Sequence, residues 1–296
     1  MGKTVKVKRE WISGWIMVLP YFLFFLVFSL YPIVQGFQLS LHKWSLFGDN
    51  TFVGFKNYLD LLQDPKFLRF LGLTLGFAAV SVPLFTAAGL LLALLVNGLR
   101  RAKTFFRSVL FYPYILSVSV ISSIWVVLLQ PYTGEFSRLI KWLGVETEVF
   151  WLTDPKLAWV SLLMATLWWT IGFNFVLFLA ALQDIPDTLY EAAKMDGANR
   201  WQLFRHITLP SLSRVTVLVV ILQTIASLKL FGQSYLITGG GPAEATRTLI
   251  FYIYDKGFTE YELGYASAIG FYVLLLIGMI SLIQFKLLNR KGGEQA

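Results

Sequence analysis

Long apolar runs without charge alternate with short charged segments along the chain. Asp, Glu, Lys and Arg are absent from residues 11–42, 70–99, 108–134, 157–183 and 263–285. Each run exceeds the about 20 residues with which an α-helix crosses roughly 30 Å of hydrocarbon. A further apolar segment, 212–238, carries only Arg214 near its start and Lys229 in its interior. The pattern predicts six membrane-crossing helices, at about 12–34, 71–97, 108–130, 157–182, 212–237 and 263–286.

The distribution of Lys and Arg predicts which helix ends face the cytoplasm. Fifteen basic residues fall in the two terminal segments and the second and fourth loops, against nine in the other three loops. Cytoplasmic loops of membrane proteins carry such an excess. We therefore expect an all-α polytopic membrane protein with both termini cytoplasmic. Its expected parts are a tail, first helix and outer loop at 1–70, a core at 71–286 with a cytoplasmic loop at about 184–213, and a tail at 287–296.

The first apolar run could also belong to a cleaved signal peptide, because Lys3, Lys6, Lys8 and Arg9 precede it. The run is too long for the apolar region of a signal peptide, and it lacks a small-x-small cleavage site. An uncleaved helix is therefore the favoured interpretation.

Composition supports a membrane protein and excludes several kinds of site. Hydrophobic residues make up 56% of the chain and charged residues 14%, against roughly 25% charged residues in soluble domains. The net charge of +8 comes from short clusters between apolar runs, which indicates membrane orientation rather than nucleic-acid binding. The chain has no cysteine, which excludes disulfides, thiolate metal sites and cysteine nucleophiles.

The apolar segments contain no catalytic constellation. The six expected helices hold no carboxylate and no histidine, since His42 and His206 lie at a segment end or in a loop, and the chain has no HExxH, GxSxG or GxxxxGK[ST] motif. An intramembrane enzyme would need a nucleophile and a base within reach of one another. We therefore expect no catalytic residue and no metal site. The glycines at 239–241 precede Pro242 rather than a Lys-Ser pair, so we interpret them as a turn and not as a phosphate cradle.

The loop at 184–213 has the pattern of two short helices. Asp187 is a plausible N-cap for a helix over 188–196, and Asn199 for a second over 199–207. Gly197 lies between them and can adopt a left-handed conformation. The pair could be a solvated connector on the membrane surface, or it could dock in the groove of another protein.

The run EAAKMDGANRWQLFRHITLP, residues 191–210, resembles the EAA loop of permease subunits in binding-protein-dependent ABC importers. SLYPIVQGFQLSL, FVGFKNY at 52–58, IPDTLYEAA and LITGGGPAEATRTLIFYIYDKGF at 236–258 resemble the carbohydrate-importing, maltose-permease branch. The outer loop at 43–69 departs from some maltose permeases, because it has no room for their large extra domain. The positions that keep the EAA pattern are Glu191, Ala192, Ala193, Asp196, Gly197, Ala198, Phe204, Ile207, Leu209 and Pro210.

The resemblance implies a type I ABC importer fold and a multi-pass subunit of the cytoplasmic membrane of a prokaryote. It implies three protein partners: a second related permease, a dimer of ATPase subunits and an external solute-binding protein that delivers a carbohydrate. It also implies that ATP and magnesium bind to the ATPase, and that this chain binds no cofactor and no nucleic acid. The residues implied to dock on the ATPase are Glu191, Ala192, Ala193, Asp196, Gly197 and Ala198.

Polar residues at helical spacing indicate a possible substrate path. Gln223, Ser227, Leu230 and Ser234 would share one face of a continuous helix. Gln and Ser could contact sugar hydroxyls, or they could join helices by hydrogen bonds. The resemblance places Gln223, Ser227 and Leu230 at the sugar site. It adds Trp169, Phe173 and Asn174 from the fourth helix, for which core packing is the alternative.

Lys229 is the one charge expected inside an apolar segment. It could extend to the membrane surface, pair with an acid of a partner subunit, or attract an anionic substrate. At the level of the whole chain, the alternative to an importer permease is a membrane scaffold or an exporter half without a binding protein.

Overall fold

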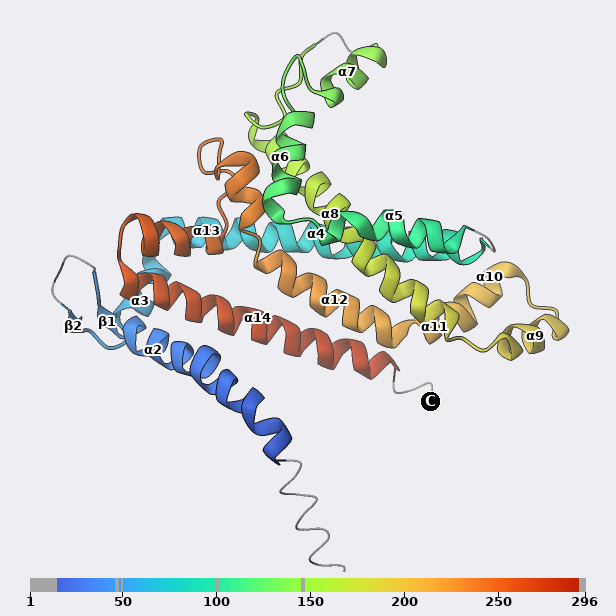
Figure 1. The fold of residues 1–296 in the computed structure, drawn as a ribbon, viewed down its shortest axis with the longest axis horizontal. Coiled ribbons are helices and arrows are strands. Elements are labelled where there is room, and N and C mark those ends of the chain that lie inside the picture. Colours follow the sequence, from blue (N-terminus) through green and yellow to red (C-terminus); the bar gives the residue numbers. More distant parts are fainter. Residues whose placement is uncertain (1–14, 46–47, 49, 100–101, 145–146, 293–296) are drawn as a thin grey trace, which may run out of the picture. The chain divides into compact units, whose positions relative to one another are not determined.

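The computed structural model describes residues 15–45, 48, 50–99, 102–144 and 147–292. The secondary structure of this part of the chain is helical apart from one short pair of strands, and loops join the helices (Figure 1). The chain divides into two compact units, of which one comprises Met1–Asp64 and Ile253–Tyr272 and the other Pro65–Tyr252 and Val273–Ala296. The basic segment at 3–9, on which the choice between signal peptide and helix depends, lies outside the described residues.

The first unit contains the helical span Trp15–Ser40, whose most hydrophobic stretch has no buried side chain. The span ends with α2 (Tyr31–Ser40), and β1 (His42–Lys43) then pairs antiparallel with β2 (Thr51–Phe52). The following helix is α3 (Lys56–Gln63). Its buried Asn57 donates hydrogen bonds to the carbonyl oxygens of Ser40 and His42, which fixes the chain where it leaves the span.

The second unit is built around α4 (Pro65–Asn97), α8 (Pro155–Gln183) and α12 (Ser213–Leu228). A core of side chains that includes Ala93, Phe178 and Val219 joins the three helices. Two glycines allow close crossings. A Cβ at Gly89 would lie 2.7 Å from the Cβ of Asn174, and one at Gly172 would overlap the carbonyl oxygen of Leu110. The remaining helices with residues in this unit are α5 (Lys103–Ile115), α6 (Val118–Leu128), α7 (Glu135–Trp142), α9 (Asp187–Met195), α10 (Arg200–Leu203), α11 (Leu209–Ser211), α13 (Leu249–Tyr254) and α14 (Leu263–Gly292).

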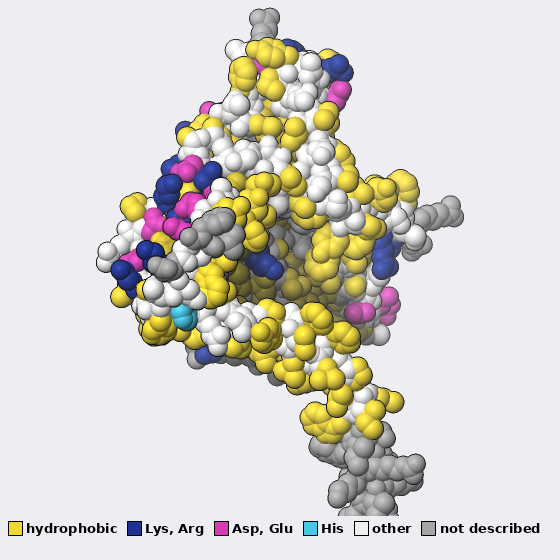
Figure 2. Space-filling model, turned by 60° about the vertical axis from the view of Figure 1, so that its left-hand side comes forward, with side chains coloured by type: hydrophobic (Ala, Val, Ile, Leu, Met, Phe, Trp, Pro, Cys, Tyr) yellow, Lys and Arg dark blue, Asp and Glu magenta, His cyan; other side chains and the backbone are white. Residues whose placement is uncertain are grey.

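The surface of the described residues suits a membrane. Hydrophobic side chains cover large areas of the face drawn in Figure 2, and many of the charged side chains gather in separate clusters. Among the described residues, four helices are long and apolar enough to cross a bilayer, or up to six if each of two bent pairs is one span. The expected helices at 71–97, 157–182 and 263–286 are confirmed as Pro65–Asn97, Pro155–Gln183 and Leu263–Leu287.

The third expected helix, 108–130, is not continuous. Lys103–Ile115 and Val118–Leu128 meet at 98°. The hydroxyl oxygen of Ser117 accepts a hydrogen bond from the Val120 N–H and so begins α6 anew. The indole of Trp169 donates to the carbonyl oxygen of Leu116, which the bend removes from a helix. These two hydrogen bonds satisfy the Val120 N–H and the Leu116 carbonyl at the break. The run of residues without charge did not predict this break.

The fifth expected helix, 212–237, is also interrupted. α12 ends at Leu228, and a separate π-helical turn, Ser234–Thr238, follows. Lys229 is the C-cap of α12 and is exposed, so it lies at a helix end and not inside a helix. Ser234 therefore does not share a helix with Gln223, although both side chains are buried.

Candidate functional site

The loop at 184–213 folds as the expected pair of short helices. α9 begins after Pro186, which is its N-cap, so the expected N-cap Asp187 instead occupies the first turn. There its carboxylate faces the positive end of the helix dipole. α9 ends at Met195 with Asp196 as its C-cap, and Gly197, which follows, has a φ of +81°. The N–H of Gly197 donates to the Lys194 carbonyl and that of Ala198 to the Ala193 carbonyl, which satisfies the last turn.

The second helix of the loop is fixed at its start and to the first helix. Asn199 and Gln202 form a capping box, in which each side chain accepts from the other residue's backbone N–H, at 2.9 and 2.7 Å. The helix continues as the π-helical turn Phe204–Thr208. The hydroxyls of Tyr190 and Thr208 are hydrogen-bonded at 2.9 Å, so α9 is tied to the segment that enters the membrane core.

The surface of α9 combines free charge with small residues. Glu191, Ala192 and Asp196 are exposed, whereas Ala193 and Ala198 are half-buried. Within the described part of the chain, neither carboxylate forms an ion pair. Met195 is 88% exposed, which is unusual for an apolar side chain at the end of an ordered helix. This surface therefore offers both charge and apolar area to a partner.

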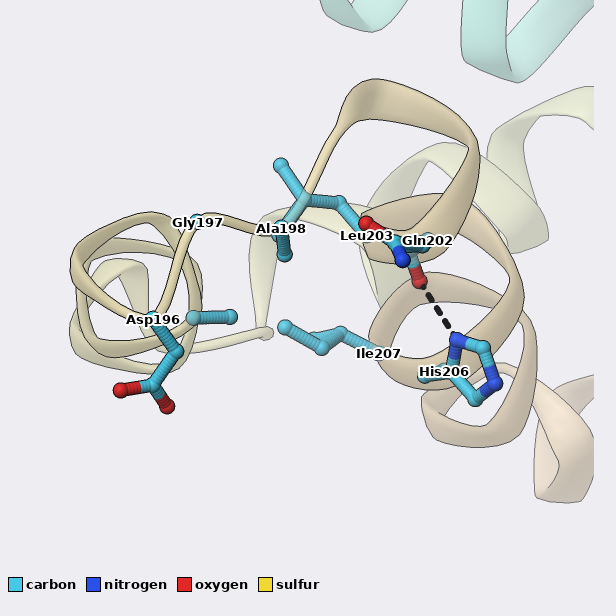
Figure 3. A pocket seen from close by; sticks show the side chains of 8 residues that line it. Asp196, Gly197, Ala198, Gln202, Leu203, His206 and Ile207 are labelled. Atoms are coloured by element: carbon cyan, nitrogen blue, oxygen red, sulfur yellow. Dashed lines mark hydrogen bonds between the residues drawn. The ribbon is translucent and has the colours of Figure 1, made fainter.

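A pocket of about 320 Å³ opens between α9 and the helical segment after Asn199. In Figure 3 the side chains of Ala198, Leu203 and Ile207 approach it, while the Asp196 carboxylate points away. His206 forms a hydrogen bond through Nδ1 to the Gln202 carbonyl at 3.0 Å. The pocket is large enough for one side chain.

The polar residues expected on the substrate path form a buried network. Asn174 of α8 donates to Oε1 of Gln223 at 3.1 Å, and Gln223 donates to the Ser227 hydroxyl at 3.3 Å. Ser81 of α4 donates to the same hydroxyl at 2.8 Å. All four side chains are at most 5% exposed. The network joins α4, α8 and α12 in the conformation described here.

The other expected path residues have contacts outside this network. Trp169 is half-buried and bonded to the Leu116 carbonyl. Phe173 is half-buried and stacks on Tyr114, with ring centroids 5.1 Å apart. Leu230 is buried, and its carbonyl accepts from the Thr248 hydroxyl.

Sequence reasoning did not single out Ser81 or Tyr114. Ser81 is the only serine in the apolar run 70–99, and its burial at 0% exposure is the structural sign of its role. Such a residue could have been found as a polar group that needs a partner within hydrocarbon. Tyr114 carried no distinguishing sequence signal.

Two charged clusters lie in loops outside the spans. The hydrogen bond from the Lys141 ammonium, followed by that from the Tyr132 N–H, lowers the pKa of Glu148 to about 2. Burial by itself would lower the pKa of Lys256, but hydrogen bonds to Glu260 and Glu262 outweigh it and raise that pKa. Among the described residues, no group of three or more His, Cys, Asp and Glu side chains could hold a metal ion.

Comparisons with known proteins match almost the whole chain. The family described as "Binding-protein-dependent transport system inner membrane component" matches residues 85–292. The trehalose/maltose transport system permease protein MalF of Thermococcus litoralis is 37% identical over 278 residues, which cover 92% of this chain and 93% of that protein. The sn-glycerol-3-phosphate transport system permease protein UgpA of Brucella abortus is 32% identical and covers 93% and 96%.

The fold is similar to that of a solved transporter structure. A chain in the crystal structure of a bacterial alginate ABC transporter, in complex with an alginate pentasaccharide-bound periplasmic protein, superposes with a TM-score of 0.86. The similarity covers 99% of both chains at 24% sequence identity. This agreement confirms the expected type I importer fold of the polytopic helical chain.

Proposed function

Because the chain belongs to the family of inner-membrane components of binding-protein-dependent transport systems, we propose that it is one permease half of an ATP-driven sugar importer. In this proposal a second, related permease completes the path. Two ATPase subunits bind ATP and magnesium on the cytoplasmic side, and an external solute-binding protein delivers the sugar. The family match counts against the alternative of an exporter half or a scaffold without a binding protein.

The observation that carries the proposal is the exposed surface of α9. Glu191 and Asp196 are exposed and form no ion pair within the described part of the chain. Glu191 is the proposed anchor for a basic group of the ATPase. Ala192 and Ala193 allow the ATPase backbone to approach closely, because their side chains are small. Gly197 and Ala198 turn the chain, so that α9 stands apart from the membrane helices.

The loop is connected to the helices that hold the polar network. α9 follows α8 through Ile185, and the segment after α10 leads through Leu212 into α12; Ile185 and Leu212 are both buried in the core of the second unit. The Tyr190–Thr208 hydrogen bond joins the two sides of the loop. Movement of α9 by the ATPase would therefore move α8 and α12, as a rigid-body switch between inward- and outward-open states. For ATP to drive this switch, the ATP-bound ATPase must favour one of the two states.

We propose a carbohydrate as the cargo, because the similar proteins include a trehalose/maltose permease and a chain of an alginate transporter. Trp169 and Phe173 offer aromatic faces on which sugar rings stack, and Leu230 adds apolar surface. Asn174, Gln223 and Ser227 have the amides and hydroxyls that sugar hydroxyls require. In the described conformation these three groups bond to one another. Sugar binding to them would therefore replace bonds of the network as α8 and α12 move.

The test is purification and reconstitution of the assembled complex. The proposal expects this chain to co-purify with a second permease and an ATPase, and to support ATP-dependent uptake of a labelled sugar with the binding protein present. Glu191→Lys should abolish uptake and leave the intrinsic ATPase activity intact, whereas Glu191→Gln should reduce uptake less. Uptake by purified chain alone, or unchanged uptake by Glu191→Lys, would overturn the proposal.

A further inference from the structure

One face of α12 remains uncovered in the second unit. Arg214, Leu218, Leu222, Ala226 and Lys229 are exposed, and their spacing of four, four, four and three residues places them on one stripe. The other side of the helix is covered: Gln223 and Ser227 face the network with α4 and α8, and Thr224 accepts a hydrogen bond from Gln284 of α14. Lys229 thus ends a stripe that no described helix of this unit covers.

The depth of Lys229 makes lipid an unfavourable environment for it. α12 has 16 residues, which correspond to a rise of about 24 Å. The hydrocarbon layer of a bilayer is roughly 30 Å thick. If α12 starts at one boundary of this layer, Lys229 therefore lies inside it. An ammonium that faces lipid at such depth is costly. A water-filled path, or a ligand in it, is a better environment. The negative end of the α12 dipole also favours a cation at this C-cap.

The ammonium of Lys229 has three donors, and none is used within the described part of the chain. Its neighbours differ in this respect, because Asn174, Gln223, Ser227 and Ser81 already bond to one another. Lys229 is therefore the polar group on this section of α12 that can take a ligand without breaking an existing bond. An ammonium donates and never accepts, and charge-assisted bonds to carboxylate or phosphate are its strong interactions.

We propose that Lys229 binds an anionic group of the transported sugar, so that the cargo class is an acidic sugar or a sugar phosphate. This inference rests on the proposed function of sugar import. The side chain would act as a specificity-determining residue at the C-terminal end of α12, two residues after Ser227. A carboxylate and a phosphate share the chemistry that Lys229 recognises, and the experiment must distinguish them.

The experiment measures ligand binding to the complex of both permeases and the ATPase in lipid nanodiscs. The labelled ligands are a glucuronate-containing disaccharide, glucose 6-phosphate and neutral maltose. The wild type should bind one of the two anionic ligands more tightly than maltose. Because a hydrogen bond to a charged group is lost, Lys229→Gln should weaken binding of that ligand about 10-fold or more and leave maltose unchanged.

Two variants serve as controls. Lys229→Arg keeps the charge and should retain most of the preference for the anion. Arg214→Gln removes the other cation of the same stripe and should leave the binding of all three ligands unchanged.

Three results would overturn the inference. The first is that the wild type binds neither anionic ligand more tightly than maltose. The second is that wild type and Lys229→Gln bind the anionic ligands equally, as expected for a lysine that reaches the lipid surface. The third is loss of the second permease from the Lys229→Gln complex, which would assign Lys229 to a partner carboxylate. Failure of the wild-type complex to import any sugar would instead contradict the proposed function, so the two failures are distinguishable.

Discussion

The side-chain amide of Asn174 donates to Oε1 of Gln223 at 3.1 Å and so links α8 to α12 inside the bundle. Both residues were expected to face a sugar, and both are buried in a network completed by Ser227 and Ser81. In hydrocarbon an unpaired amide is costly. The network therefore stabilises this arrangement of α4, α8 and α12 at the place where the path is proposed.

The first prediction is that Asn174 and Gln223 are energetically coupled. Asn174→Leu and Gln223→Leu should each destabilise the protein, because each leaves a buried amide without its hydrogen-bond partner. The loss of unfolding free energy in the double variant should be smaller than the sum of the two single losses. Double-mutant cycles in membranes give coupling energies of about 0.6 kcal/mol on average and about 1.7 kcal/mol at most. Unfolding in detergent titrations measures this coupling. Thr170→Val is the control, because the Thr170 hydroxyl donates to the Thr166 carbonyl of the same helix. Its effect on stability should add to that of Gln223→Leu. Additive effects of Asn174→Leu and Gln223→Leu would contradict the prediction.

The sequence predicted the long spans well because their signal is cumulative. The run 157–182 lacks charge throughout, and α8 extends only two residues further at its start and one at its end. The break between α5 and α6 could not be seen in the same way. Its stabilising bonds come from Ser117 and from Trp169, which is 53 residues away from Leu116. A hydrophobicity pattern cannot predict a contact between residues so far apart in the sequence.

The candidate site was predictable to different degrees. The turn at Gly197 and the cap at Asn199 depend on local chemistry, and both are confirmed. The common face of Gln223 and Ser234 was assumed from a continuous helix and fails where α12 ends. The hydrogen bonds of Asn174 and Gln223 depend on which helices are neighbours, and periodicity does not contain that information.

The second prediction concerns the crossing of α5 and α8. Gly172→Ala should strongly reduce the amount of folded protein, since the added Cβ overlaps the Leu110 carbonyl oxygen and the backbones must separate. Overpacking typically costs about 1–3 kcal/mol, and occasionally more. Membrane expression and the midpoint of thermal unfolding measure the effect. The matched control is Gly76→Ala in α4, where the added Cβ meets nothing within 4 Å. This variant should have a neutral or slightly stabilising effect. Equal expression and equal unfolding midpoints of the two variants would contradict the prediction.

The third prediction concerns the turn after α9. Gly197→Pro should abolish sugar uptake, because proline requires a φ near −65° and has no N–H to donate to Lys194, whereas Gly197 has a φ of +81°. Gly197→Asn should retain most of the uptake, since asparagine tolerates left-handed backbone. Uptake is measured at matched membrane levels of each variant. Normal uptake by the proline variant would show that the turn is not needed for coupling.

The fourth prediction is a pH dependence of the loop between α6 and α8. The pKa of Glu148 is lowered to about 2 from 4.5, chiefly by the hydrogen bond from Lys141. A carboxyl with a lowered pKa contributes stability that is complete above its unfolded pKa and is lost as the pH falls toward the folded pKa. The difference in Tm between wild type and Glu148→Gln should therefore be constant near neutral pH and shrink between about 4.5 and 2.

The control for this prediction is Glu135→Gln. Glu135 pairs with Arg138 on the exposed surface of α7, and such surface pairs contribute little, so its Tm difference should be small at every pH. A Tm difference for Glu148→Gln that does not change with pH would contradict the assignment.

The central claim is that α9 docks on a separate ATPase, and cross-linking from position 191 tests it most directly. The chain has no cysteine, so Glu191→Cys places a single thiol on α9 for a photoreactive label in the reconstituted complex. Trp142→Cys, in the exposed end of α7, is the control on the loop expected at the opposite membrane face. The account predicts a covalent adduct with the ATPase from position 191 and none from position 142. Adducts of position 191 with lipid alone would contradict it.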